Sequence, residues 1–355
     1  MIPLYGHEVL RTRLVSAHER GALPSSLLLH GPEGVGKQRL ALWIGQLLLC
    51  TADGNRPCGT CGHCRYVIDF THPDLRWFFP RPRLTNPDPK TQDVLDDFVD
   101  AIGERRRSSG LYTAPGGSEA LYVATIRAIL QLASLTPAMG RRMIFIIGDA
   151  ERMVSQEGAD QAANAFLKML EEPQADTQII LTSSEPGSLL PTIRSRTVAV
   201  RVPPLTEPAS RDFLRDPLVT ACLERLDVPA SLEGRIDLMA GAPGRLLGSV
   251  DRGQAAVVAR EFLDAVSQGR AEWSLVVAKM SAARARGFFA ETLDAMTVQL
   301  HQKLREAAVQ LDARRAAAIA RAIEALEDSK QLVDGNVNPQ LLGASIAREV
   351  AKWSI

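Results

Sequence analysis

The sequence of 355 residues lacks a net charge, a long apolar run and an internal repeat. Its 41 basic residues balance its 41 acidic residues, which disfavours a protein that coats nucleic acid and leaves room only for a local basic patch. No apolar run approaches the length of a membrane span, and the N-terminal MIPLYGHEVLRTRL lacks the apolar core of a signal peptide. We therefore expect a cytoplasmic protein with no membrane partner.

Cysteine is also scarce, at five residues, yet four of the five crowd together in the pattern C-x7-C-x2-C-x2-C: Cys50, Cys58, Cys61 and Cys64. In a reducing compartment such clustering favours a metal over disulfides. Four thiolates complete a tetrahedral Zn²⁺ site with no open position, which predicts a structural zinc. An iron–sulfur cluster, ligation by the neighbouring His63 and a set of free thiols are the alternatives. Cys222 stands alone, and we expect a small buried residue there.

Short apolar runs alternate with helical patterns over the first two hundred residues. This alternation predicts βαβ units and a mainly parallel sheet covered on both faces. The expected strands are Leu27–Leu29, Leu75–Phe79, Met143–Ile147, Gln178–Thr182 and Thr197–Val202, and the expected helices include Lys37–Leu49, Ala120–Leu135 and Gly158–Leu170.

The length allows two or three domains. Pro203, Pro204 and Pro208 interrupt the alternating pattern, and from about Gln254 the chain is almost wholly helix-forming. We predict an α/β domain at 1–204 with a zinc module at 50–64, a small helical domain at 205–252 and an all-α domain at 253–355. Residues 80–118, which carry several prolines, are expected to be a loop insertion.

The segment from Gly31 to Gln38 reads GPEGVGKQ, between an apolar strand and a helix. It fits the phosphate-binding pattern G-x-x-x-x-G-K, in which backbone N–H groups around Gly31, Gly34 and Gly36 cradle phosphate oxygens and Lys37 reaches the outer phosphates. The hydroxyl that normally ligates magnesium is replaced by Gln38. The alternative is a glycine-rich turn that holds no ligand.

Asp149 and Ala150 follow the strand expected to carry the acidic metal residue of a P-loop ATPase. Asp149 could still help to hold a metal, but the next position, where a second carboxylate would activate water, is a methyl group. Glu151 is expected to point to the opposite face, because neighbours on an extended chain alternate. The pocket is therefore expected to bind phosphates but to hydrolyse them poorly. The alternative for Asp149 is a solvated turn residue.

Two arginines lie in motifs that can serve phosphate chemistry: Arg196 in Ser-Arg-Thr and Arg245 in Gly-Ala-Pro-Gly-Arg. Taken singly, each is more often a surface arginine, and it is the order of the features that favours a role for both. A third set, Arg105–Arg107, is a short basic run for which a solvated helix face is a better interpretation than DNA contact.

Taken in order, these motifs resemble bacterial clamp-loader subunits of the AAA+ superfamily. The resemblance is dense over residues 5–247 and thin beyond, where only Asn336-Val337-Asn338 is suggestive. It rests on Gly31–Lys37, the cysteine cluster, His72-Pro73-Asp74, Asn164–Pro173, Thr182–Pro186, Leu189–Arg196 and Gly241–Arg245.

The resemblance implies an AAA+ P-loop domain with a parallel sheet, a small helical lid domain and an all-α collar domain. It implies a heteropentamer with gamma/tau and delta subunits that places the sliding clamp on primed DNA, with ATP or ADP as a ligand beside the structural Zn²⁺. By the same resemblance, Arg196 is similar to an arginine finger acting in trans, Arg245 to the lid residue that senses nucleotide, and Thr182 to a polar sensor. Gly6 would border the adenine.

Two departures favour the delta-prime type among these subunits. The hydrolysing subunit carries Lys-Thr or Lys-Ser and Asp-Glu, whereas this chain has Lys37-Gln38 and Asp149-Ala150 and keeps Arg196. The alternatives are an ATP-hydrolysing gamma/tau-type subunit and a stand-alone adaptor with a vestigial P-loop. The cysteine cluster disfavours a restriction- or recombination-type AAA+ protein.

Overall fold

The structure is a computed structural model that describes residues 1–86, 88–112, 119–153, 160–174, 176–224, 226, 228–247, 249–268, 273–280, 285–310, 312–333 and 339–351. The chain forms two compact units, one that ends at Leu247 and one that covers the described residues from 249 onward. The first unit contains both the α/β region and the small helical region expected after residue 204. The division into three domains at 204 and 252 stays a prediction.

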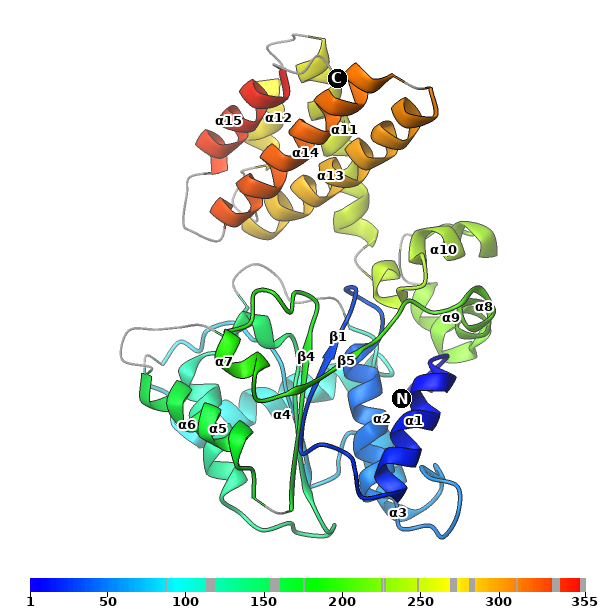
Figure 1. Ribbon diagram of the computed structural model, residues 1–355, viewed down its shortest axis with the longest axis vertical. Coiled ribbons are helices and arrows are strands. Elements are labelled where there is room, and N and C mark those ends of the chain that lie inside the picture. Colours follow the sequence, from blue (N-terminus) through cyan, green and yellow to red (C-terminus); the bar gives the residue numbers. More distant parts are fainter. Residues whose placement is uncertain are drawn as a thin grey trace. The chain divides into compact units, whose positions relative to one another are not determined.

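A five-stranded parallel sheet runs through the first unit (Figure 1). Its strand order is β2-β3-β4-β1-β5, so β1, β3 and β4 end side by side. β3 and β4 are buried along their whole length, and β3 (MIFII) is accordingly apolar throughout, whereas β4 (TQIILTS) is apolar only at its centre. The strands are β1 (Ser26–His30), β2 (Leu75–Phe78), β3 (Met143–Ile147), β4 (Thr177–Ser183) and β5 (Val198–Arg201).

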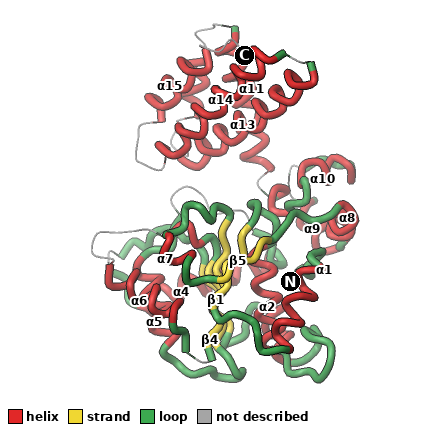
Figure 2. Tube along the Cα trace, in the orientation of Figure 1, coloured by secondary structure: helices red, strands yellow, loops and turns green. Residues whose placement is uncertain are grey.

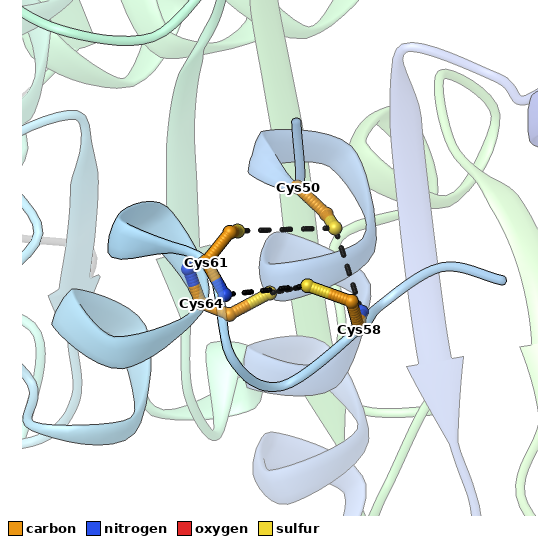
Figure 3. A group of neighbouring side chains, drawn as sticks. All are labelled: Cys50, Cys58, Cys61 and Cys64. Atoms are coloured by element: carbon orange, nitrogen blue, oxygen red, sulfur yellow. Dashed lines mark hydrogen bonds between the residues drawn. The ribbon is translucent and has the colours of Figure 1, made fainter. Parts of the chain in front are cut away.

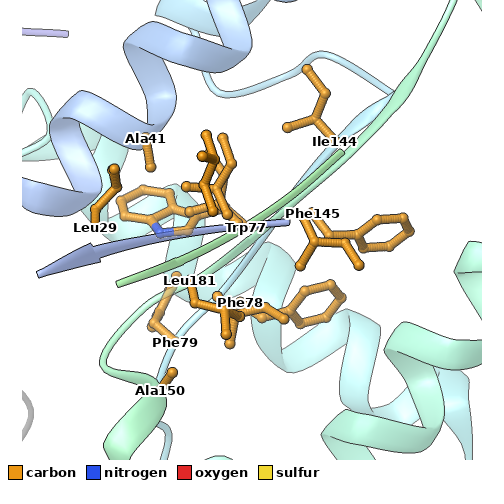
Figure 4. Close-up of a cluster of buried hydrophobic side chains, with 14 of the residues drawn as sticks. Leu29, Ala41, Trp77, Phe78, Phe79, Ile144, Phe145, Ala150 and Leu181 are labelled. Carbon is orange, nitrogen blue, oxygen red and sulfur yellow. The ribbon is translucent and has the colours of Figure 1, made fainter. Parts of the chain in front are cut away.

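Helices cover both sides of this sheet, with α1 and α2 on one side and α5 and α6 on the other (Figure 2). The side chains between these layers form one apolar core, part of which is shown in Figure 4, with Trp77 and Leu181 near its centre. The helices of this region are α1 (Glu8–Glu19), α2 (Lys37–Leu49), α3 (Gly62–Ile68), α4 (Thr91–Arg107), α5 (Val123–Ala133), α6 (Asp160–Glu171) and α7 (Pro191–Arg194), with a 3₁₀ turn η1 (Ala150–Arg152).

Helix α4 corrects the expectation of a loop over residues 80–118. Val94, Phe98 and Ala101 are buried at helical spacing, and the Phe98 ring contacts the rings of Phe78 and Phe79 at centroid distances of 4.9 and 5.2 Å. The prolines that suggested a loop all precede this helix, where they do not interrupt its hydrogen bonds. The prediction was therefore wrong for Thr91–Arg107.

A small helical region follows the sheet and has its own apolar cluster, which Ile2 joins from the N-terminus. The cluster gathers the buried faces of short helices around Phe213, Val219 and Met239. These helices are α8 (Glu207–Arg215), α9 (Pro217–Leu223), α10 (Leu232–Met239) and a 3₁₀ turn η2 (Pro243–Leu246).

The described part of the second unit consists of helices around a separate core. Phe262, Phe289, Met296 and Leu326 are fully buried in it. These helices are α11 (Ser249–Ser267), α12 (Trp273–Met280), α13 (Ala285–Val309), α14 (Ala313–Val333) and α15 (Pro339–Ala351). The Asn336–Asn338 motif lies outside the described residues.

The predicted fold class is confirmed: a parallel α/β region with a P-loop, a small helical region and an all-α C-terminal unit. Met143–Ile147 and Lys37–Leu49 begin and end where the sequence predicted, and the other expected strands and helices differ by a few residues at their ends. Within the described ranges, every helix is too short or too polar to cross a bilayer.

Candidate functional site

The predicted phosphate loop, acidic residue and polar sensor come from three adjacent strands. The loop follows β1, Asp149 follows β3, and Thr182 is the penultimate residue of β4, where it pairs in register with Leu29. Because the carboxyl ends of parallel strands meet at one edge of the sheet, these groups are brought together there. The backbone N–H of Asp149 donates to the Thr182 hydroxyl at 3.1 Å, which joins two of the three strand ends directly.

The loop itself depends on glycine at Gly31. This residue has a φ of +153°, and a Cβ there would collide with the carbonyl oxygen of Val202. Gly36 follows at a φ of +94° as the residue before α2, so the helix begins with Lys37. This is the strand–loop–helix context that the phosphate-binding motif requires.

Lys37 is buried and folded back on its own loop. Its ammonium group donates to the carbonyl oxygens of Gly31 at 3.0 Å and Pro32 at 2.9 Å, and to the Ser184 hydroxyl at 2.8 Å. These three acceptors use all three ammonium protons. Burial lowers the pKa of Lys37, and the carboxylates of Asp149 and Glu151 oppose that shift. A phosphate would have to replace some of these acceptors.

Gln38 is buried, and both the nitrogen and the oxygen of its amide are hydrogen-bonded. Its Nε2 donates to Asp149 Oδ2 at 2.9 Å, and its Oε1 accepts from the indole N–H of Trp77 at 2.9 Å and from Arg105 Nη1 at 3.4 Å. The orientation of the amide follows from its partners, since indole N–H only donates and a carboxylate only accepts. The two positions that would share a magnesium ion are thus hydrogen-bonded to each other.

Gly148 makes room for this arrangement. A Cβ at Gly148 would lie 2.5 Å from each terminal atom of the Gln38 amide. The amide therefore packs on the backbone that leads into Asp149, and the contact needs glycine at this position.

The acidic turn after β3 differs from the expectation for an extended chain. Asp149 lies in the left-handed region, with φ 47° and ψ 55°, and Ala150 begins the 3₁₀ turn η1. This turn brings Glu151 toward the pocket, where its Oε1 accepts the backbone N–H of Ser184 at 2.8 Å. Its other carboxylate oxygen is buried without a hydrogen-bond partner. The prediction that Glu151 points away was wrong, because it assumed that residues 149–151 were extended.

The Asp149 carboxyl group is affected by its surroundings. Burial raises the pKa of Asp149 to about 6, the charge of Glu151 adds to the rise, and Lys37 and Arg105 oppose it. Ala150 is buried in the apolar core, so the second position of the acidic pair has no polar group. The pocket thus holds two cations and two carboxylates, and its Gln38 and Asp149 side chains are already paired.

Arg196 lies between α7 and β5, away from these strand ends. Its Nε donates to Glu171 of α6 at 3.0 Å, and its Nη1 donates to the carbonyl oxygen of Thr192 at 3.1 Å. The side chain is partly exposed. Arg245 lies in η2 and is exposed.

Gly6, expected beside the adenine, has a φ of +68° and packs near Leu205. The geometry thus joins Gly31–Gln38, Asp149 and Thr182 in one pocket. Arg196 is not part of it.

The predicted metal ligands converge (Figure 3). The sulfur atoms of Cys50, Cys58, Cys61 and Cys64 all lie within 4.8 Å of one another. The Cys58–Cys64 distance is 3.9 Å and the Cys61–Cys50 distance is 4.0 Å. A tetrahedron with Zn–S bonds of about 2.3 Å has edges of about 3.8 Å, so the four sulfurs fit a zinc ion.

Backbone N–H groups support thiolate character in this cluster. Cys58 Sγ accepts from the N–H of Cys61 at 3.3 Å, and Cys50 Sγ accepts from the N–H of Cys58 at 3.4 Å. The bond from Cys61 to the Cys58 sulfur, with those from Thr60, lowers the pKa of Cys58 to about 6. Burial instead raises the pKa of Cys64, a cost that a bound cation would offset. Cys222 lies outside this cluster and is half-buried.

His63 is paired with a second histidine outside the cysteine cluster. Its Nδ1 lies 2.8 Å from Nε2 of His72, whose Nδ1 accepts the backbone N–H of Asp74 at 3.1 Å. His72 therefore carries its proton on Nε2 and donates it to His63. The competing role of His63 as a ligand is disfavoured by this contact.

The His72-Pro73-Asp74 motif also has a structural role. Asp74 is fully buried, and its carboxylate accepts backbone N–H groups from Ala138, Met139 and Gly140. Burial alone would raise the pKa of Asp74, but these N–H donors outweigh burial and hold it below 3.8. The carboxylate thereby fixes the loop that leads into β3.

Sequence reasoning missed Trp77, Arg105, Gly148 and Ser184 as parts of the pocket. Arg105 had a detectable signal, because it continues the spacing of Val94, Phe98 and Ala101 on α4. Its guanidinium is buried, so the expectation of a solvated face was wrong for this residue. Ser184 and Gly148 adjoin the ends of β4 and β3 and carry no comparable signal.

Comparison with known proteins identifies the family to which the chain belongs. The family model described as "DNA polymerase III, delta subunit" matches residues 6–206. DNA polymerase III subunit delta' of Pseudomonas aeruginosa is 32% identical over 232 residues, which cover 65% of this chain and 58% of that protein. The Bacillus subtilis delta' subunit is 29% identical over 213 residues, covering 60% and 52%. The match spans little more than half the length of these relatives.

The chain is also similar to proteins other than delta' subunits. The gamma/tau subunit of Mycobacterium tuberculosis is 29% identical over 193 residues, covering 54% of this chain and 26% of that protein. A crystal structure of a gamma subunit-related protein from Thermotoga maritima has a TM-score of 0.44 at 17% identity, covering 96% of this chain and 99% of that one. A TM-score this low carries no weight, and the assignment rests on the family model. Because the family model covers more than half of this chain, the chain belongs to the DNA polymerase III delta subunit family.

Proposed function

We propose that this chain is a delta-prime-type subunit of a DNA polymerase III clamp loader in the cytoplasm. It assembles with gamma/tau and delta subunits in a heteropentamer through its C-terminal collar, residues 253–355. Through that complex it helps to place the sliding clamp on primed DNA. Its pocket holds ATP or ADP without efficient hydrolysis, and Arg196 acts on the nucleotide of the adjacent subunit.

The observation that carries this proposal is the bond between Gln38 and Asp149. In a hydrolysing P-loop enzyme, a hydroxyl and a carboxylate at these positions hold magnesium on the nucleotide. Here the 2.9 Å hydrogen bond occupies both side chains, and Ala150 offers no carboxylate to water. The loop and Lys37 remain, so phosphate binding is retained while the groups for cleavage are lost.

The position of Arg196 supports a role in trans. Arg196 lies outside its own pocket, on a turn held by Glu171 and by the Thr192 carbonyl oxygen. A guanidinium fixed in this way loses little further freedom when it meets a neighbour's phosphate. As an arginine finger it would stabilise the charge that develops during transfer of the phosphoryl group.

The test is the ATPase rate of the loader reconstituted with Arg196→Ala. We expect a fall on the order of a hundredfold or more, since arginine fingers contribute at least this much. Arg194→Ala is the matched control, because Arg194 is an exposed arginine on the same turn, and it should leave the rate unchanged. Equal rates for the Arg196→Ala and wild-type loaders, with the pentamer intact by gel filtration, would refute the finger role.

The zinc module has a structural role in this proposal. The four sulfurs form a closed tetrahedron without room for a substrate, so a bound zinc would hold residues 50–64 and take no part in chemistry.

One observation favours a second candidate, the ATP-hydrolysing gamma/tau-type subunit. The carboxylate of Glu151 lies at the pocket with one buried oxygen unpartnered, and it could orient a water molecule. The purified chain distinguishes the two functions. Steady ATP turnover that Glu151→Gln abolishes would favour the hydrolysing subunit, and no turnover supports the delta-prime type.

A further inference from the structure

Arg105 lies on the inner face of α4, where it packs against three aromatic rings from outside that helix. Its guanidinium carbon lies 3.2 Å from the ring centroid of Phe79, 3.6 Å from that of Tyr112 and 4.4 Å from that of Trp77. Burial lowers the pKa of Arg105 to about 10, which leaves it charged at neutral pH. Three ring faces offset part of the cost of removing this charge from water.

The guanidinium also contacts Gln38, the residue that follows Lys37 on α2. Arg105 Nη1 donates to Gln38 Oε1 at 3.4 Å, and Gln38 in turn donates to Asp149. Trp77 contacts both Arg105 and Gln38. Its ring packs against the Arg105 guanidinium, and its indole N–H donates to the Gln38 oxygen that also accepts from Arg105. A continuous chain therefore runs from the cation through the amide to the carboxylate.

This chain occupies the groups that a divalent cation would need. Magnesium requires nearly octahedral oxygen ligands at about 2.0–2.1 Å and usually keeps several waters. The Gln38 oxygen already accepts two hydrogen bonds, and Asp149 Oδ2 already accepts one. A magnesium ion bound by the Gln38 oxygen or by Asp149 Oδ2 would compete with these bonds, and it would place a second cation near a buried guanidinium.

We propose that Arg105 is the resident cation of the pocket, so that the site takes a nucleoside di- or triphosphate as the free anion and not as its magnesium complex. The inference rests on the proposed nucleotide-binding function. Arg105 acts as a positioning residue through Gln38 and supplies a fixed positive charge next to that amide. It also accounts for a glutamine in place of the usual hydroxyl, because the longer amide reaches Trp77, Arg105 and Asp149 together.

The test measures binding of ADP and ATP to the full chain by calorimetry, with millimolar magnesium or with EDTA. We expect the two dissociation constants to agree within about twofold, whereas a metal-dependent pocket would bind about tenfold or more tighter with magnesium. Tenfold tighter binding with magnesium would overturn the proposal. Failure to bind nucleotide under either condition would overturn it too, while the ATPase test of Arg196 would stand unaffected.

Two variants separate the resident cation from a merely structural arginine. Arg105→Met keeps an apolar side chain among the rings and should weaken ADP binding by about tenfold in EDTA, the loss expected for a charge-assisted contact. Arg106→Met, an exposed neighbour on the same helix, should bind as the wild type does.

Gln38→Thr frees Asp149 and should make ADP binding magnesium-dependent, with no change to Arg105. Gln38→Thr also keeps the proposal testable if Arg105→Met does not fold. Wild-type affinity in folded Arg105→Met, or magnesium-independent binding in Gln38→Thr, would refute the role of the Arg105–Gln38 pair.

Discussion

The backbone N–H of Gly244 donates a hydrogen bond to the carbonyl oxygen of Gly34 at 2.9 Å. The phosphate loop and the small helical region therefore touch backbone to backbone. A Cβ on Gly244 would lie 2.6 Å from the Cα of Gly34, so neither residue has room for a side chain.

Gly244→Ala should separate these two segments. We expect a loss of about 1–3 kcal/mol in the free energy of unfolding, the usual cost of forcing a methyl group into a packed contact. Urea denaturation measures the loss. Gly187→Ala is the control, because a Cβ there meets no atom within 4 Å, and equal stability of the two variants would contradict the close contact.

Cys64→Ser should remove the metal. Cys64 is fully buried, and serine cannot supply the fourth thiolate, so we expect loss of bound zinc and a melting temperature lower by several degrees. Elemental analysis and thermal melting measure both effects. Cys222→Ser, which lies outside the cluster, should keep the zinc, and a Cys64→Ser protein with full zinc content would contradict the four-sulfur site.

Asp149 should make the protein less stable as the pH rises between about 4 and 6. Burial and Glu151 raise its folded pKa from 3.8 to about 6, so the folded state binds more protons than the unfolded state in this range. A shift of two pKa units corresponds to about 3 kcal/mol in the free energy of unfolding, and this amount is lost once the pH has risen above 6.

Asp149→Asn removes this titration. The stability of the variant relative to wild type, from urea denaturation, should be greater above pH 7 than near pH 4. Glu172→Gln, which changes an exposed carboxylate, should show no such trend. A relative stability of Asp149→Asn that is independent of pH would rule out the raised pKa.

Glu171→Ala should loosen Arg196 without unfolding the chain. The ion pair is largely exposed, so its loss should cost less than about 1 kcal/mol. If Glu171 orients the guanidinium, the ATPase rate of the reconstituted loader should fall by several-fold, less than with Arg196→Ala. Glu172→Ala on the same helix end is the control. A fall equal to that of Arg196→Ala would mean that Glu171 does more than orient the arginine.

Much of the site could be predicted because its signals are local. Gly31–Lys37 and the four cysteines are defined by spacing, and Met143–Ile147 is a compact apolar run bounded by polar residues. Such patterns specify a turn, a ligand set or a buried strand without knowledge of distant residues.

The remaining parts depend on contacts between distant segments. Gln38 and Arg105 are 67 positions apart, and only folding of α4 against β2 brings them together. Glu151 was misplaced because Asp149 adopts a left-handed conformation, which aspartate tolerates better than most residues and which no periodicity indicates. Prolines drew attention away from α4, although its apolar spacing extends to Arg105.

The hydrogen bonds around His72 give the cysteine module a mechanical consequence. His63, next to Cys64 in the sequence, is hydrogen-bonded to His72. His72 accepts the backbone N–H of Asp74, and Asp74 anchors the turn at 138–140 that leads into β3. β3 in turn ends beside Asp149, at the opposite end of the strand from that turn. A distortion of the four-cysteine cluster can therefore be transmitted through these hydrogen bonds and through strand β3 to Asp149 in the phosphate pocket.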